Sequence, residues 1–245
     1  MKKIIALILS VFGLVAFTSC GEKSNSMTYE EYKNAEVDSI VTIESYIQAK
    51  QSWWEDEGVG RASFYLQDEV GAYFVYNLAC TEEDYANLTA GTKIQVTGVK
   101  GEWAGEVEIM GDSAGNEATY KVLKADKYIA SATDVTNLVN NDNLIDYQNK
   151  LVAFKGFTVV AQDEEGTAVY YKWDNSGSVG DDLYVNLEKD GVKLTIVVES
   201  YLCDKDSQVY KQVESLTVGQ TLDLEGFLYW YEGPQPHITK VTISK

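Results

Sequence analysis

Two stretches of the chain, one in each half, repeat the same alternation of apolar and polar residues. Residues 88–98 and 216–226 share the pattern Leu-Thr-x-Gly-x-x-apolar-x-apolar-x-Gly. Apolar side chains at every second position indicate a strand with one buried face. The repeated pattern therefore predicts a related strand in each half, and a chain built from two copies of one unit.

The segments around these strands follow one order in both halves: three strands, a short helix and two further strands. In the first half the pattern predicts strands over residues 40–43, 61–67, 73–79, 93–99 and 106–110. In the second half it predicts strands over residues 151–154, 183–188, 193–202, 221–231 and 237–244. Thr81 and Asp206 are expected to cap the two helices, because their side-chain oxygens accept hydrogen bonds from first-turn amides. A further short helix is expected over residues 133–140, between the copies.

Several residues in this order look like those of secreted bacterial OB-type domains. They are Tyr147-Gln-Asn-Lys-Leu-Val152 followed by Phe154-x-Gly156, together with Gly98 and Gly226 after their strands. The resemblance to the OB-fold, a small Greek-key barrel, covers residues 32–245. It implies a mostly β fold of two tandem five-stranded OB-like barrels, each with a short helix between its third and fourth strands. The barrels are expected over residues 32–131 and 132–245.

The N-terminus has the pattern of a secretion signal. A basic start is followed by an apolar run over residues 4–17, which is shorter than the roughly 20 residues of a membrane span. The run ends in Ala-Phe-Thr-Ser-Cys20-Gly, which resembles a bacterial lipobox with Phe17 in place of the usual leucine. By that resemblance residues 1–19 are removed, Cys20 is acylated, and residues 20–31 form a tether. The resulting lipoprotein would be anchored on the extracytoplasmic side of a bacterial membrane; an ordinary secretory signal is the alternative.

The charge of the chain bears on its partners. Lys and Arg number 20 and Asp and Glu 38, which gives a formal net charge of −18. A negative field repels phosphate backbones, so the charge disfavours nucleic acid as a partner. Contact with the membrane is expected through the lipid anchor, and the sequence does not indicate an oligomeric state.

Residues suited to catalysis or metal binding are scarce. His237 is the one histidine, and we expect it at the surface or the core edge rather than as a general base. The acidic runs lack the order of a calcium loop, and no cluster has metal-ligand spacing. We therefore expect a protein that is not an enzyme, with no cofactor and no metal. Cys80 and Cys203 each end an apolar strand in a different half, which favours two separate thiols; a disulfide between them is the alternative.

Aromatic residues supply the candidate binding site. In OB barrels the ligand face is formed by the second and third strands, flanked by the loops after the first and fourth strands. The candidates on that face and in those loops are Trp53, Trp54, Tyr65, Trp103, Trp173 and Trp230. Aromatic rings beside carboxylates suit a neutral oligosaccharide or a peptide, so we expect a binding protein; burial of these rings in the barrel cores is the alternative. Binding of single-stranded nucleic acid and a structural role in a surface complex are the other functions consistent with the sequence.

Overall fold

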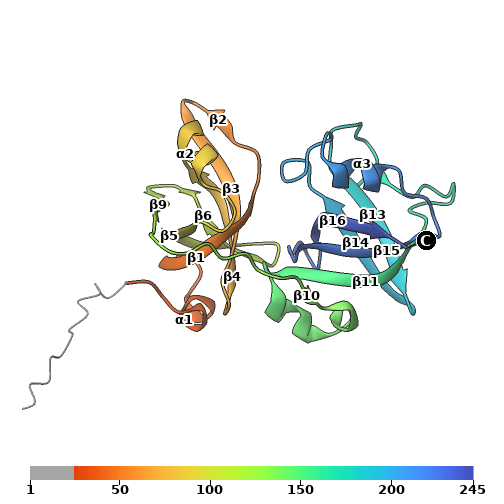
Figure 1. Cartoon of the computed structure of the whole chain (residues 1–245), viewed down its shortest axis with the longest axis horizontal. Helices are drawn as coiled ribbons and strands as arrows, with labels where there is room; N and C mark the ends of the chain where they lie inside the picture. The colour runs from red at the N-terminus through yellow and green to blue at the C-terminus, as the bar shows by residue number, and fades with distance from the viewer. Residues whose placement is uncertain (1–24, 245) are drawn as a thin grey trace, which may run out of the picture.

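The chain folds into two β-barrels that lie side by side (Figure 1). The computed structural model describes residues 25–244, so the predicted signal segment and Cys20 lie outside the described residues. Residues 123–132, which form no helix or strand, connect the two barrels. Within the described part of the chain, no helix is long and apolar enough to cross a membrane.

The first barrel closes through five long strands. These are β1 (Ile40–Lys50), β3 (Val59–Gln67), β4 (Ala72–Ala79), β5 (Lys93–Trp103) and β6 (Glu106–Met110). They pair in the order β1-β3-β4-β6-β5, and β5 returns to β1 to close the sheet. Because alternate residues of a strand point to the same side, the interior is filled from every strand, with Ile43, Phe64 and Val96 fully buried.

The second barrel has the same topology. Its strands are β11 (Leu151–Val159), β13 (Leu183–Lys189), β14 (Val192–Val198), β15 (Thr221–Phe227) and β16 (His237–Ile243). They pair in the order β11-β15-β16-β14-β13, and β11 also pairs with β13. In both barrels the third and fifth long strands run parallel, β4 with β6 and β14 with β16. This shared arrangement confirms the predicted mostly β fold of two OB-like barrels.

Short strands and 3₁₀ turns complete the fold. They are β2 (Trp54–Asp56), β7 (Asp112–Ser113), β8 (Asn116–Glu117), β9 (Thr119–Val122), β10 (Thr133–Asp134), β12 (Tyr170–Tyr171), η1 (Thr136–Leu138) and η2 (Asp142–Tyr147). Of these, β2, β9, β10 and β12 add to the barrel sheets, and β7 pairs with β8 in a separate two-stranded sheet. Of the helix predicted over residues 133–140, only the 3₁₀ turn η1 is present. Thr133 and Asp134 instead pair in parallel with β11, and the Asp134 carboxylate accepts the Thr136 N–H at 3.1 Å, which starts a tight turn.

The helix after β4 begins as predicted, and the helix after β14 does not. Thr81 caps α2 (Glu82–Asn87), accepting a hydrogen bond from the Asp84 amide. The cap of α3 (Gln208–Glu214) is Ser207, whose hydroxyl accepts from the Tyr210 amide at 3.2 Å. Asp206 belongs to the preceding turn, where its own amide donates to the Asp204 carboxylate at 2.9 Å.

A helix occupies part of the predicted tether. The helix α1 (Tyr29–Asn34) starts at a capping box made by Thr28 and Glu31, in which each residue satisfies a backbone amide of the other. Its buried Tyr32 contacts the ring of Tyr73, with centroids 4.9 Å apart. The ordered fold therefore begins before residue 32, because α1 packs on the first barrel.

Candidate ligand-binding groove

The second barrel covers the face of the first barrel that an OB-fold would use for a ligand. On that face, the ring of Tyr65 from β3 lies against the ring of Phe74 from β4 and stacks on Phe227 of the second barrel. Tyr229 contacts Phe74 edge-on at 5.7 Å. Tyr65 is fully buried in this cluster. Its prediction as a ligand contact is wrong, because the second barrel takes the place a ligand would have.

Polar contacts fix the two barrels around this aromatic cluster. We call the surface between the barrels the seam. The Glu106 carboxylate accepts hydrogen bonds from the Trp230 amide at 2.9 Å and from Gln148 Nε2 at 3.1 Å. Gln67 Oε1 accepts the Leu151 amide at 2.7 Å. These bonds join side chains of one barrel to the backbone or side chains of the other, so the relative position of the barrels is specified.

His237 belongs to the seam. Its Nδ1 lies 2.9 Å from the Tyr65 hydroxyl, and its ring stacks on Tyr229 with centroids 4.4 Å apart. Burial lowers the pKa of His237 to about 3, so the imidazole is neutral at physiological pH. The residue acts in this structure as a hydrogen-bonded core group at the edge of the barrel.

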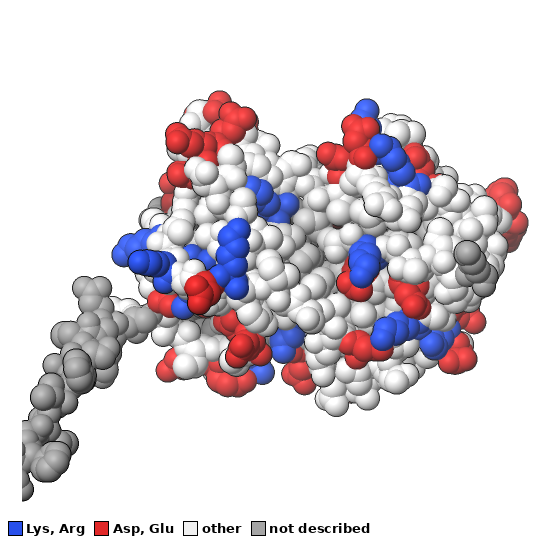
Figure 2. All heavy atoms as spheres, viewed as in Figure 1, with Lys and Arg blue, Asp and Glu red and all other residues white. Residues whose placement is uncertain are grey.

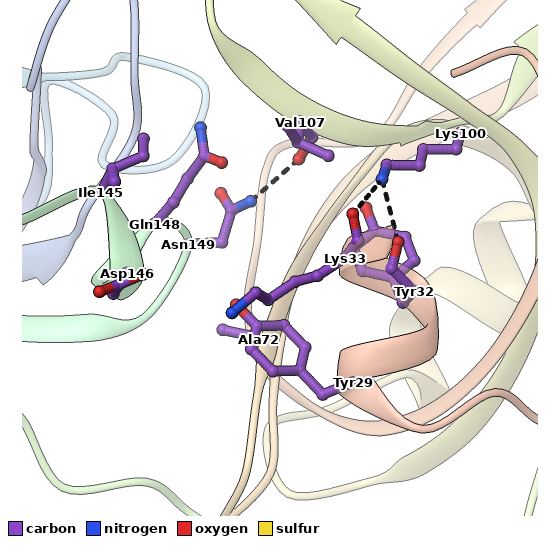
Figure 3. A pocket seen from close by; sticks show the side chains of 10 residues that line it. All are labelled: Tyr29, Tyr32, Lys33, Ala72, Lys100, Val107, Ile145, Asp146, Gln148 and Asn149. Atoms are coloured by element: carbon purple, nitrogen blue, oxygen red, sulfur yellow. Dashed lines mark hydrogen bonds between the residues drawn. The ribbon is translucent and has the colours of Figure 1, made fainter. Parts of the chain in front are cut away.

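A small pocket opens along the seam beside α1 (Figure 3). It has a volume of about 260 Å³ and lies between α1 and the segment 145–149 of the second barrel. The Lys100 ammonium donates to the carbonyls of Tyr32, Lys33 and Ala35 at 2.9, 2.9 and 2.7 Å. This cation therefore satisfies the last carbonyls of α1, which would otherwise lack donors.

A larger groove of about 510 Å³ lies on the outer face of the second barrel. Its floor is the outer side of β13 and β14, and its walls are the loop between β11 and β13 and the loop between β15 and β16. We define the groove by its lining residues, which are Gln162, Tyr170, Trp173, Tyr184, Asn186, Thr195, Tyr231, Glu232, Gly233, Pro234 and Gln235. This is the ligand face of an OB-fold, and here the other barrel does not cover it.

The floor of the groove is held by hydrogen bonds within the barrel. Thr195 Oγ1 donates to Asn186 Oδ1 at 2.7 Å, across the pairing of β14 with β13. Gln162 Nε2 donates to the Tyr184 carbonyl at 2.5 Å, which fixes one wall against the floor. Desolvation, with Asp182 and Glu199 nearby, raises the pKa of Tyr184 to about 12. Its phenol therefore stays neutral and keeps a proton to donate.

The groove offers aromatic surface with little charge. Tyr170, Trp173, Tyr184 and Tyr231 contribute rings, and Trp173 is 75% exposed. The only charged side chain in the lining is Glu232. The remaining side chains with polar groups are amides and a threonine hydroxyl. Such a surface can stack on a flat apolar face and exchange hydrogen bonds with neutral groups around it.

The predicted tryptophans separate in the structure. Trp173 lies in the groove. Trp230 directly precedes Tyr231 of the opposite wall, but it is half-buried against the core of the second barrel. Trp53 is half-buried in the first core, where its Nε1 donates to the Cys80 carbonyl at 3.0 Å. Trp54 is 38% exposed on β2, and Trp103 is 64% exposed at the end of β5. The structure thus places one of the predicted tryptophans in the groove.

The tyrosines of the groove were missing from the predicted site. Tyr184 and Asn186 alternate with the buried Leu183, Val185 and Leu187 along β13, so the alternation of the sequence already places them on the outer face. The signal that could have found Tyr184 and Asn186 is this outward alternation on the second strand; Tyr170 and Tyr231 lie in the walls of the groove, outside β13.

The two cysteines of the described chain form no disulfide with each other. Cys80 is buried and Cys203 is half-buried, and both are free thiols. Burial raises the pKa of each thiol to about 11. The predicted separate thiols are confirmed, and the alternative of a disulfide is wrong.

Comparisons with known proteins find matches among solved structures at low sequence identity. No protein-family model and no curated protein matches the chain. A structure of a replication protein A heterotrimer bound to ssDNA is 11% identical over 87% of this chain and 51% of that chain, with a TM-score of 0.35. This chain therefore spans about half the length of that chain. A murine DNA-binding protein bound with dsDNA is 8% identical over 83% of this chain and 96% of that chain, with a TM-score of 0.36. The single-stranded DNA binding protein from Thermus aquaticus is 14% identical over 84% of this chain and 92% of that chain, with a TM-score of 0.27.

Proposed function

We propose that the protein is a binding protein, and not an enzyme, whose second barrel holds a neutral, hydroxyl-rich oligosaccharide in the groove. The observation that carries the proposal is the lining of the groove: four aromatic rings, neutral amides and a hydroxyl, with one carboxylate as the only charge. Sugar rings have an apolar face that can lie on an aromatic ring. Their hydroxyls can donate to Asn186 or Gln235 and accept from Tyr184.

A peptide would use the same groups less completely. The side-chain amides of the groove can pair with a peptide backbone, but the floor strand β13 offers no unpaired edge for an added strand, and the edge strand β12 is only two residues long. The pairing of β13 with β12 and β14 occupies both of its edges. Stacking on rings therefore supports a saccharide more than a peptide.

Single-stranded nucleic acid is the alternative. Two of the solved structures above contain bound DNA. Binding of a nucleic acid strand requires stacking rings, which the groove has, and a positively charged track for the phosphates. No lysine or arginine lines the groove. On the face seen in Figure 2, basic side chains are interspersed with acidic ones and form no continuous band. Charge therefore supports a neutral ligand.

We further propose that the protein works outside the cytoplasm, held to a membrane through acylated Cys20. The support is the signal pattern of residues 1–20. A lipid anchor and a groove on the barrel farther from the N-terminus would present the groove away from the membrane. Replacing Cys20 by Ser should abolish acyl labelling and release the protein from membranes; labelling that persists would contradict the anchor.

The test of ligand class is a direct binding measurement on the full chain in detergent. We expect neutral oligosaccharides of the cello or malto series to bind. Trp173→Ala should weaken that binding about 5- to 150-fold, if a sugar stacks on one ring as strongly as a base does, at about 1–3 kcal/mol. Trp54→Ala is the matched control, because Trp54 is also exposed but lies on β2 of the other barrel.

A parallel titration with single-stranded DNA at low and high salt separates the alternative. Tight DNA binding that weakens steeply with salt and is lost in Trp173→Ala would replace the saccharide by nucleic acid. The proposed function would be overturned if no saccharide of either series bound and if Trp173→Ala changed the binding of no ligand.

A further inference from the structure

Trp103 is an exposed aromatic residue at a well-fixed position. It ends β5 and is 64% exposed, so its indole is not part of either core. The turn that follows, Ala104-Gly105, has positive φ at both residues, 52° and 92°, which is the backbone of a tight two-residue hairpin. Figure 1 shows the β5–β6 hairpin reaching from the first barrel toward the second.

The turn of this hairpin contacts the loop that forms one wall of the groove. The Ala104 carbonyl accepts the Glu232 amide at 2.7 Å. Gly105 packs so closely on the indole of Trp230 that a Cβ placed at Gly105 would lie 2.8 Å from its Cδ1. On the other side, Gln148 Nε2 donates to the Gly105 carbonyl at 2.8 Å. The turn is therefore held by the second barrel on two sides.

Trp103 lies on the side of the hairpin that faces the second barrel. Trp103 and Glu106 are directly paired across the two strands, and paired residues project from the same face of a sheet. The Glu106 carboxylate points at the second barrel, where it accepts the Trp230 amide. Trp103 thus shares a face with Glu106, which is bonded to the β15–β16 loop. Trp103 also directly precedes Ala104, whose carbonyl accepts the amide of Glu232 in the groove.

We propose that Trp103 forms an additional subsite at the end of the groove, so that one extended saccharide contacts both barrels. The inference rests on the proposed function of the groove. A short ligand would occupy the rings on the second barrel, and a longer one would extend past Glu232 and stack on Trp103. Because the seam already fixes the hairpin against the wall, little conformational freedom is lost when the ligand reaches Trp103.

The test compares ligand lengths in the full chain. For the wild type we expect hexasaccharides of the cello or malto series to bind about tenfold more tightly than disaccharides. Trp103→Ala should remove that advantage and leave disaccharide binding unchanged, whereas Trp173→Ala should weaken both. Trp103→Phe should keep most of the advantage, because a ring remains, and Trp54→Ala should have no effect on either length.

The outcomes separate this inference from the function on which it rests. If both lengths bind through Trp173 with equal affinity, or if Trp103→Ala leaves the length dependence intact, the subsite is wrong and the groove stands. If neither length binds, the proposed function fails and the subsite fails with it. The midpoint of thermal unfolding is measured for each variant. A midpoint equal to that of the wild type shows that the variant is folded and that its lower affinity comes from the missing ring.

Discussion

The ring of Tyr65 in the first barrel stacks on the ring of Phe227 in the second, with centroids 4.3 Å apart and planes 10° from parallel. Tyr65 lies on the outer face of its own barrel, and Phe227 belongs to the cluster with Tyr65 and Phe74 rather than to the core of the second barrel. The contact therefore joins two separately formed cores. It also explains why only one of two similar barrels keeps an open ligand face.

Phe227→Ala tests this role of the seam. Removing a buried phenylalanine ring costs about 3–5 kcal/mol, and here the loss falls on the contact between the barrels. We expect the midpoint of urea unfolding to fall and the single transition to broaden or divide as the barrels unfold more independently.

Phe154→Ala is the comparison, because Phe154 is fully buried in the core of the second barrel. That variant should destabilise the second barrel itself. If Phe227→Ala leaves the transition unchanged in midpoint and shape, the aromatic cluster does not couple the barrels.

Glu106 makes stability dependent on pH. Desolvation raises the pKa of this seam carboxyl from 4.5 to about 8. No ion pair with Lys or Arg offsets this effect in residues 25–244. The titratable groups around it are Glu108 on its own strand and the tyrosines Tyr32, Tyr65 and Tyr229. The folded state binds this proton more tightly than the unfolded state does. The resulting contribution of Glu106 to the free energy of unfolding is therefore fully present below pH 4.5 and is lost as pH rises through about 8.

The clearest window for this effect is pH 6.5 to 8. Below pH 6.5, His237 acts in the opposite direction, because its lowered pKa favours the folded state only while the imidazole is neutral. From pH 6.5 to 8 we expect Glu106 to remove at most about 2 kcal/mol, at 1.36 kcal/mol for each pKa unit. Urea unfolding at several pH values across this window measures how steeply the free energy of unfolding falls with pH.

Glu106→Gln is the control for the assignment. Glu108 and Glu199, whose pKa values burial raises to about 7, still contribute up to that pH. The variant should therefore lose the slope between pH 7.5 and 8 and keep part of it below pH 7. A slope identical to that of the wild type across the whole window would assign the titration to another group.

The sequence was sufficient to predict the barrels, because alternation and order are properties of each strand and its neighbours. The pattern of Ile94 and Val96, repeated at Leu222 and Leu224, corresponds to β5 and β15 in equivalent places. The seam could not be predicted in this way. Tyr65 is on the outer face by alternation, and nothing local in the sequence distinguishes an outer face that binds a ligand from one that packs on another barrel.

The same limit applies to the site. Trp173 was found because a loop tryptophan is conspicuous, but Trp53 and Trp230 have the same appearance and are half-buried. What separates them is the partner each indole meets, such as the Cys80 carbonyl for Trp53. Those partners lie at positions that only the folded chain brings together.

Lys100 should be required for the docking of α1. Its ammonium is the donor for three carbonyls at the end of that helix. Lys100→Met keeps the apolar stem and leaves those carbonyls without this donor, which costs about 1–3 kcal/mol for a buried group. We expect lower stability and faster proteolytic cleavage near residue 35. Lys33→Met is the control, since Lys33 makes a solvent-exposed pair with Glu30; equal cleavage in both variants would contradict this role.

Gly105 should tolerate no side chain, because the close approach of the hairpin to the second barrel depends on its missing Cβ. Its φ of +92° disfavours any other residue, and a Cβ would come within 2.8 Å of the Trp230 indole.

Gly191→Ala is a matched control: Gly191 has a φ of +80°, in the turn between β13 and β14, with nothing within 4 Å of a Cβ. Both substitutions add the conformational cost of about 1 kcal/mol, and Gly105→Ala adds displacement of the hairpin from Trp230. We expect Gly105→Ala to lower the free energy of unfolding clearly more than Gly191→Ala, and to change the fluorescence of the tryptophans. Equal destabilisation by the two substitutions would mean that the hairpin does not press on Trp230, and that the wall of the groove is not held by the first barrel.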